Sequence, residues 1–340
     1  MTSSRFHVVA KIAVILAFIV VMLGAYTRLG DAGLGCPDWP GCYGKLVLPE
    51  NTLGLEHAQQ AFPAIPIQPH KAWKEMVHRY FAGTLGILIF VLAIWATKRR
   101  RVDLKQPIVL PWFIAGFVVL QAAFGMWTVT WKLLPAVVTA HLLGGMLLAS
   151  LLCWLALSTR HQRKRLIPFW ADNSALRPLR KWAMLGLIIL SIQIFLGAWT
   201  STNYAALACS TFPDCHGSFF PHMEWIRAFD LWHPIGPNYE GGLLDKAARS
   251  TIQMTHRYGA CITFIYLLGL ILVIFSKDKF KPLYKLTSFI LILLIAQVVL
   301  GILNVVLLLP IDNAVAHNGV AVLLLLSVLS LVYRTSRKTD

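Results

Sequence analysis

The sequence predicts an all-α, polytopic membrane protein with eight transmembrane helices, and three observations carry this prediction. Hydrophobic residues make up 57% of the 340 residues, charged residues make up only 14%, and the mean hydropathy is +0.65. A soluble domain carries roughly 25% charged residues, so this chain is too apolar to cover its surface against water. Eight separate stretches reach the length of about 20 apolar residues that a membrane-spanning helix needs. Segments such as residues 87–96 are apolar on every face, which excludes the alternating strands of a β-barrel.

The eight predicted spans follow one another along the whole chain. Pro111 and Pro135 stand near span ends, where a missing backbone N–H costs least. The predicted spans are residues 8–28, 76–97, 107–129, 136–158, 182–202, 252–275, 286–309 and 314–333.

The chain has a formal net charge of +16, and most of its 31 lysine and arginine residues fall on one side of the predicted topology. Cytoplasmic loops of membrane proteins are enriched in these residues. We therefore expect a multi-pass protein of a bacterial-type plasma (inner) membrane with both termini in the cytoplasm. The two long loops, at about residues 29–74 and 203–251, are then exoplasmic. Topology and attraction to lipid headgroups account for the positive charge, so nucleic acid is not an expected partner.

The sequence contains an internal repeat, which is a sign of duplicated architecture. The segment Leu23–Thr27 (LGAYT) returns as Leu196–Thr200 (LGAWT). The segment Glu75–Tyr80 (EMVHRY) returns as Gln253–Tyr258 (QMTHRY). An even number of spans separates equivalent points, so the two halves have the same orientation. We expect two pseudo-repeated four-helix bundles, at residues 1–158 and 182–340, joined by a cytoplasmic linker at residues 159–181.

Four of the 11 histidines lie within predicted spans, and all four lie at a similar depth near the outer surface. Imidazoles from neighbouring helices, with small residues beside them, suit a heme iron ligated on both faces. Histidines that merely hydrogen-bond between helices are the alternative. Neither pair has a further ligand at suitable spacing, so zinc or another metal is not expected. The four residues are His78, His141, His256 and His317.

The two halves differ at one ionisable position. Glu75 precedes His78 by three residues, whereas Gln253 precedes His256. A carboxyl group beside a heme pocket can accept or donate a proton, and an amide cannot. We therefore expect the first half to perform chemistry and the second half to hold a permanent heme. A helix-start carboxylate favoured by the helix dipole is the alternative interpretation of Glu75.

An arginine directly follows a histidine in both halves, at Arg79 and Arg257. Arginine binds carboxylates well, so both residues are candidate contacts for heme propionates. Interfacial side chains that extend toward water are the alternative.

Two cysteine pairs share a C-x5-C spacing in the loops predicted to be exoplasmic, where disulfides persist. We expect the disulfides Cys36–Cys42 and Cys209–Cys215, with either a structural or a redox role.

A glutamine followed four residues later by a glycine recurs near the outer ends of three odd-numbered spans. This face either lines the heme pockets or packs small residues between helices. The motifs begin at Gln121, Gln193 and Gln297.

Together these features resemble the heme A synthase family over nearly the whole chain. The resemblance rests on eight spans, duplicated halves, an E-x-x-H-R motif, single histidines in three further spans and both C-x5-C loops. It implies that His256 and His317 ligate a b-type heme, and that His78 and His141 hold the substrate heme. It also implies that Glu75 is the essential carboxylate.

The family oxidises the C8 methyl group of heme O to a formyl group, which gives heme A for terminal cytochrome oxidases. The implied partners are the heme O substrate, membrane lipid, heme O synthase and cytochrome oxidase assembly factors. The alternative function is a diheme b-type membrane cytochrome that transfers electrons from quinol. Such a carrier would hold two chemically identical hemes and would not need Glu75.

Overall fold

The computed structural model describes residues 2–48, 52–63, 66–104, 106–163 and 176–336. Within these residues every regular element is a helix, and eight helices are long and apolar enough to cross a membrane. The prediction of an all-α, polytopic membrane protein is therefore confirmed. The eight helices are α1 (Thr2–Leu29), α3 (Pro69–Arg100), α4 (Val109–Thr130), α5 (Pro135–Arg163), α6 (Leu179–Thr202), α8 (Lys246–Phe275), α9 (Tyr284–Val306) and α10 (Ile311–Ser336). Shorter elements are α2 (Thr52–Ala61), α7 (Trp225–Ala228) and the 3₁₀ helix η2 (Asp278–Leu283).

Some helix ends differ from the predicted spans because the first turn of a helix or the backbone conformation after it, and not the apolar segment, sets the end. Helix α3 begins at Pro69, several residues before its predicted span, because proline fits the first turn of a helix. Helix α8 begins at Lys246, where the side chain of Asp245 accepts a hydrogen bond from the backbone N–H of Ala248 at 2.8 Å. Helix α9 ends at Val306, before the predicted end at 309, because the residues that follow adopt left-handed backbone conformations.

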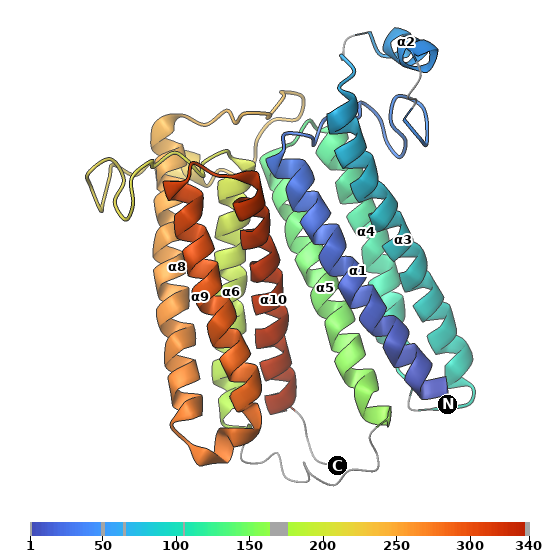
Figure 1. Ribbon diagram of the computed structural model, residues 1–340, viewed down its shortest axis with the longest axis vertical. Coiled ribbons are helices and arrows are strands. Elements are labelled where there is room, and N and C mark those ends of the chain that lie inside the picture. Colours follow the sequence, from blue (N-terminus) through green and yellow to red (C-terminus); the bar gives the residue numbers. More distant parts are fainter. Residues whose placement is uncertain (1, 49–51, 64–65, 105, 164–175, 337–340) are drawn as a thin grey trace.

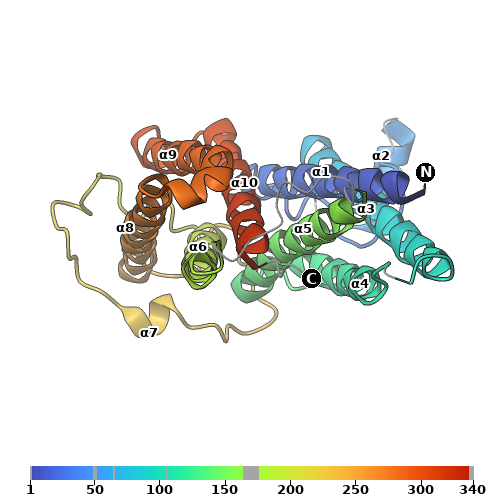
Figure 2. The same ribbon diagram turned by 90° about the horizontal axis from the view of Figure 1, so that it is seen from below.

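The long helices pack as two groups of four. Helices α1, α3, α4 and α5 contact one another, and so do α6, α8, α9 and α10 (Figure 1). The groups meet along α1, α5, α6 and α10, which occupy the middle of the molecule in Figure 2. The expected linker at 159–181 is shortened by helix at both ends, and residues 164–175 lie outside the described part of the chain. The division into two repeated halves remains a prediction.

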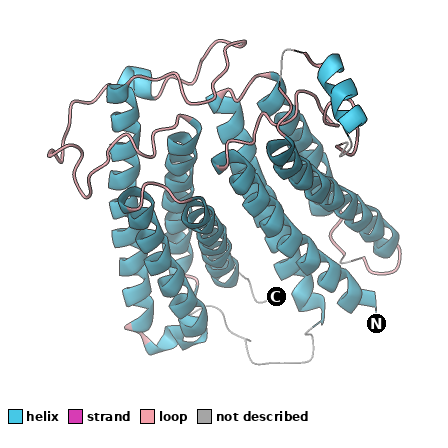
Figure 3. Cartoon of the chain, turned by 45° about the horizontal axis from the view of Figure 1, so that its top comes forward, coloured by secondary structure: helices cyan, strands magenta, loops and turns pink. Residues whose placement is uncertain are grey.

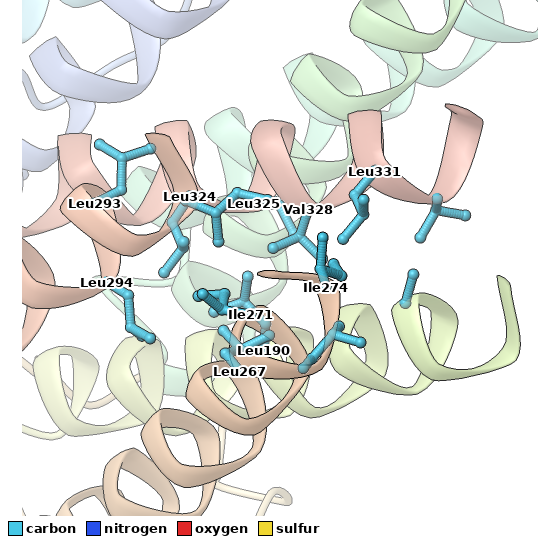
Figure 4. Close-up of a cluster of buried hydrophobic side chains, with 14 of the residues drawn as sticks. Leu190, Leu267, Ile271, Ile274, Leu293, Leu294, Leu324, Leu325, Val328 and Leu331 are labelled. Atoms are coloured by element: carbon cyan, nitrogen blue, oxygen red, sulfur yellow. The ribbon is translucent and has the colours of Figure 1, made fainter. Parts of the chain in front are cut away.

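A cluster of buried aliphatic side chains joins the four helices of the second group (Figure 4). Leu190 of α6, Leu267 and Ile271 of α8, Leu294 of α9 and Val328 of α10 belong to it. Lipid tails are as apolar as leucine, so close packing holds these helices together more than exclusion of water does. The cluster fixes the helix positions on which the site depends.

Both cysteine-bearing loops lie at one end of the molecule, and the start of α1 and the end of α10 lie at the other (Figures 1 and 3). We call these the disulfide end and the terminal end. The loop between α1 and α3 carries α2, and the loop between α6 and α8 carries α7. The candidate site is built beneath these two loops.

Candidate functional site

All four predicted histidines lie in the first three turns of their helices, at the disulfide end, and each faces a glycine of the preceding long helix. A methyl group added to the glycine would lie 3.0 to 3.4 Å from Cε1 of the imidazole. The contact would be tight at three of the four positions, where the ring would have to shift by a few tenths of an ångström, and ordinary at Gly125. The pairs are Gly24 with His78, Gly125 with His141, Gly197 with His256, and Gly301 with His317.

The structure brings the histidines together in the two predicted pairs. His78 of α3 and His141 of α5 lie on helices that both pack against α1 and α4. His256 of α8 and His317 of α10 lie on helices that both pack against α6 and α9. Each pair lies within one group of four helices. The chain thus presents two pairs of imidazoles, one in each group.

The ring nitrogens have the chemistry that iron ligation needs. Nδ1 of His78, of His141 and of His317 is buried and has no hydrogen-bond partner. A buried polar atom without a partner costs about 1–3 kcal/mol, and these three Nδ1 atoms lack one at matching positions in both halves. Paired neutral imidazoles are heme ligands in many proteins. These residues therefore fit a heme in each half.

The glutamine motifs lie on the same helix faces as the glycines. Nε2 of Gln193 lies 3.0 Å from Nδ1 of His256, and Nε2 of Gln297 lies 3.1 Å from Nε2 of His317. In the first half, Gln121 packs against α5 at Gly144. The sequence left the role of this motif open, and the structure places it beside the histidines.

Glu75 is a buried carboxylate in α3, and both of its oxygens are engaged. Oε1 accepts a hydrogen bond from Nη2 of Arg79 at 2.5 Å, and Oε2 accepts one from the backbone N–H of Cys36 at 2.9 Å. Only 6% of the Glu75 side chain and 12% of the Arg79 side chain are exposed. The acid expected beside the first histidine pair is therefore fixed to the disulfide loop above it.

Arg79 also fastens the first disulfide loop. Its Nη1 donates to the backbone oxygens of Asp38 at 2.9 Å, Pro40 at 3.3 Å and Gly41. The guanidinium group is therefore already bound to protein on several sides, and its predicted contact with a propionate remains a prediction.

Arg257 occupies the corresponding position in the second half. Its guanidinium donates to four backbone oxygens of the second disulfide loop, those of Cys209, Thr211, Pro213 and Asp214. Oε1 of the nearby Gln253, which stands where the first half has Glu75, is buried without a partner. The two halves share the arginine and its loop but differ in the charge beside it.

The structure joins both predicted cysteine pairs. The S–S distances are 2.05 Å for Cys36–Cys42 and 2.01 Å for Cys209–Cys215. Beyond each bridge, a tyrosine of the histidine-bearing helix donates its hydroxyl to the loop, from Tyr80 to the oxygen of Leu46 and from Tyr258 to that of Phe219. In each H-R-Y segment, the histidine therefore faces a glycine while the arginine and the tyrosine hold the disulfide loop.

A family model described as cytochrome oxidase assembly protein (COX15-CtaA) matches residues 7–329. The chain belongs to this family. The matched range contains Glu75 and all four site histidines, so the family model covers the whole candidate site. The predicted resemblance is thereby confirmed at the level of the family.

Individual relatives in the family carry a more specific name. The chain is 47% identical over 324 residues to the heme A synthase of Shewanella oneidensis, which covers 95% of this chain and 94% of that protein. It is 28% identical over 338 residues to the heme A synthase of Allorhizobium ampelinum, with coverage of 92% and 85%. It is 27% identical over 340 residues to the heme A synthase of Rhizorhabdus wittichii, with coverage of 93% and 89%.

Two parts of the site were not expected from the sequence. In the sequence Gly24 is only part of the repeated LGAxT segment, and its contact with His78 depends on how α1 and α3 pack. The backbone contacts are the second part: Arg79 and Arg257 are candidate propionate contacts in the sequence, and the structure shows both donating to backbone oxygens of the loops. The repeated H-R-Y segment was the one signal in the sequence that pointed to these loop contacts.

Proposed function

We propose that the chain is a heme A synthase, an oxidoreductase that converts the C8 methyl group of heme O into the formyl group of heme A. The observation that carries the proposal is one difference between two matched histidine pairs. The first pair has Glu75 one helical turn away, ion-paired with Arg79. The second pair has Gln253 in that place. The names of the relatives support the same conclusion.

In this proposal each half holds one heme. His78 and His141 ligate the substrate, heme O, and residues 1–158 form the catalytic half. His256 and His317 ligate a b-type heme cofactor, and residues 182–340 form the half that holds it. When bound, the cofactor supplies one-electron transfer beside the substrate. The facing glycines allow each imidazole to lie against the neighbouring helix, which limits the directions in which its ring can point.

Glu75 is the residue that handles protons. Conversion of a methyl to a formyl group takes one oxygen atom from water and releases four protons and four electrons, and an electron acceptor outside this chain must take up the electrons. A carboxylate near the reacting carbon can accept protons and stabilise positive charge that develops there. The bonds from Arg79 and Cys36 hold this carboxylate in one position, so it needs little rearrangement during the reaction.

We place the disulfide end on the exoplasmic side of the plasma (inner) membrane. The two disulfides lie at this end, and disulfides persist in oxidising compartments. The described connections at residues 98–104 and 277–285, which are rich in lysine and arginine, lie at the terminal end, and this fits the cytoplasmic side. Heme O synthase and cytochrome oxidase assembly factors are the proposed protein partners.

Pigment extraction from the purified full-length protein tests the function. The wild type, produced in cells that make heme O, should yield heme B together with heme O or its hydroxylated or formylated products. Glu75→Gln should retain both hemes and yield no heme A. Glu56→Gln changes an acid of α2, which carries none of the four site histidines, and should leave the product unchanged.

Heme B as the sole pigment in every variant would refute the proposal. That result would favour the diheme cytochrome that transfers electrons from quinol. A Glu75→Gln variant that makes heme A at the wild-type rate would remove the proposed role of the carboxylate alone.

A further inference from the structure

The side chain of Gln193 in α6 makes two contacts with the same histidine. Its Nε2 lies 3.0 Å from Nδ1 of His256 and donates to the backbone oxygen of His256 at 3.0 Å. Nδ1 of His256 is thus the one Nδ1 among the four site histidines that has a hydrogen-bond partner. The carboxamide carries a donor and an acceptor on one carbon, so a half-turn of its end offers either of them to the ring.

The equivalent position in the first half cannot make this contact. The LGAYT and LGAWT segments align Val20 of α1 with Gln193 of α6, and a valine side chain has no hydrogen-bonding group. Nδ1 of His78 is buried and has no hydrogen-bond partner. The facing glycine is present in both halves, as Gly24 and Gly197. The space beside the two imidazoles is therefore similar, and the side-chain amide is the difference.

A hydrogen bond to the second nitrogen of an imidazole ligand has a known effect. When that nitrogen donates its N–H to an acceptor, the bond fixes the orientation of the ring and raises its basicity, and its loss typically lowers metal affinity 10- to 100-fold. Oε1 of Gln193, which has no other partner, is the acceptor that the half-turn of the carboxamide brings to Nδ1–H. The other glutamine motifs do not distinguish the halves in this way, because Gln121 and Gln297 occupy equivalent positions on α4 and α9. Gln193 is thus the member of the motif that occurs in one half alone.

We infer that Gln193 is a positioning residue that makes the second-half heme a permanent cofactor, and that Val20 in its place leaves the first-half heme exchangeable. This inference rests on the proposed function, because it assigns the substrate to the first half. A substrate must leave after reaction, so a weaker hold by His78 suits turnover. A cofactor must stay, so the additional bond to His256 suits retention.

Heme capture by excess apomyoglobin tests the inference in the purified full-length protein. Gln193→Met keeps the length of the side chain and removes both hydrogen bonds. It should release heme B about 10- to 100-fold faster than the wild type and should shift the electron paramagnetic resonance of the low-spin ferric heme. Gln193→Glu keeps an acceptor for Nδ1–H and should restore slow release. Val20→Met places the same new side chain in the first half and should leave heme B release unchanged.

The reciprocal variant protects the test against a protein that fails to fold. Val20→Gln adds the contact to the first half and should slow the release of heme O or heme A from it. Wild-type release of heme B by Gln193→Met, or unchanged release of heme O by a folded Val20→Gln, would overturn the inference. Absence of a stable heme B from the wild type would instead overturn the proposed function before any variant is compared.

Discussion

Replacement of Glu75 by glutamine should loosen the first disulfide loop as well as abolish the product. The carboxylate accepts the backbone N–H of Cys36 at 2.9 Å in a position where 6% of the side chain is exposed. A hydrogen bond to a charged group contributes about 1.5–3 kcal/mol, and one between neutral groups about 0.5–1.5 kcal/mol. The amide oxygen of Glu75→Gln can still accept this hydrogen bond. The variant therefore loses only the difference between a charged and a neutral hydrogen bond, about 1–1.5 kcal/mol. Since 1.4 kcal/mol corresponds to a factor of ten, opening of the loop should become roughly tenfold more frequent.

Hydrogen–deuterium exchange read by mass spectrometry measures this directly. The peptide that contains Cys36 and Cys42 should exchange roughly tenfold faster in Glu75→Gln than in the wild type. Glu240→Gln is a matched control, because Glu240 pairs with Lys71 at 4.0 Å in a more exposed position, and such pairs contribute little. Exchange that is unchanged or slower in Glu75→Gln would refute the conclusion that the carboxylate holds the loop.

Three further predictions concern the same parts of the molecule. Gly197→Ala would place a methyl group 3.0 Å from the facing imidazole, so it should lower stability by about 1–3 kcal/mol and weaken heme binding in that half. Gly83→Ala is the control: its added methyl meets nothing within 4 Å, so it should lower neither stability nor heme binding. An equal loss of stability in both variants, measured by thermal unfolding, would contradict the glycine–imidazole contact. Serine at both Cys36 and Cys42 opens a short loop and should cost about 2 kcal/mol; an unchanged unfolding temperature under oxidising conditions would contradict a structural role for this bridge. Burial raises the pKa of Tyr43 above its ordinary value of 10.0, and the nearby carboxylates of Glu75 and Asp38 raise it further. The protonated phenol therefore contributes its full stability below pH 10, and this contribution is lost as the pH rises through the raised pKa. An ultraviolet titration of the wild type minus Tyr43→Phe should show this late ionisation, and ionisation at or below pH 10 would contradict it.

The helices could be predicted because membrane spans are determined by composition over about 20 residues. The eight predicted spans correspond to eight long helices in the same order. The ends of α3 and α8 could not be predicted from hydropathy, because Pro69 and Asp245 extend these helices through polar segments. Helix ends depend on capping and on backbone conformation more than on apolarity.

The site could be predicted in its residue types but only partly in its contacts. The positions of the histidines followed from the repeat, and the Cys36–Cys42 pair followed from its spacing and its place in a loop. The partners of Arg79 could not be predicted, because they are backbone oxygens of a loop separated from it by about 40 residues in the chain. The contact of Gly24 with His78 depends on the register of two helices, which apolarity alone does not determine.

The central claim is that two histidine pairs hold two different hemes, and the most direct measurement is the pigment content of single-histidine variants. His256→Ala should lose heme B and keep heme O. His78→Ala should keep heme B and lose heme O and heme A. Chromatography of extracted pigment from both proteins, in amounts normalised to protein, gives the answer. Loss of the same pigment in both variants would contradict the account.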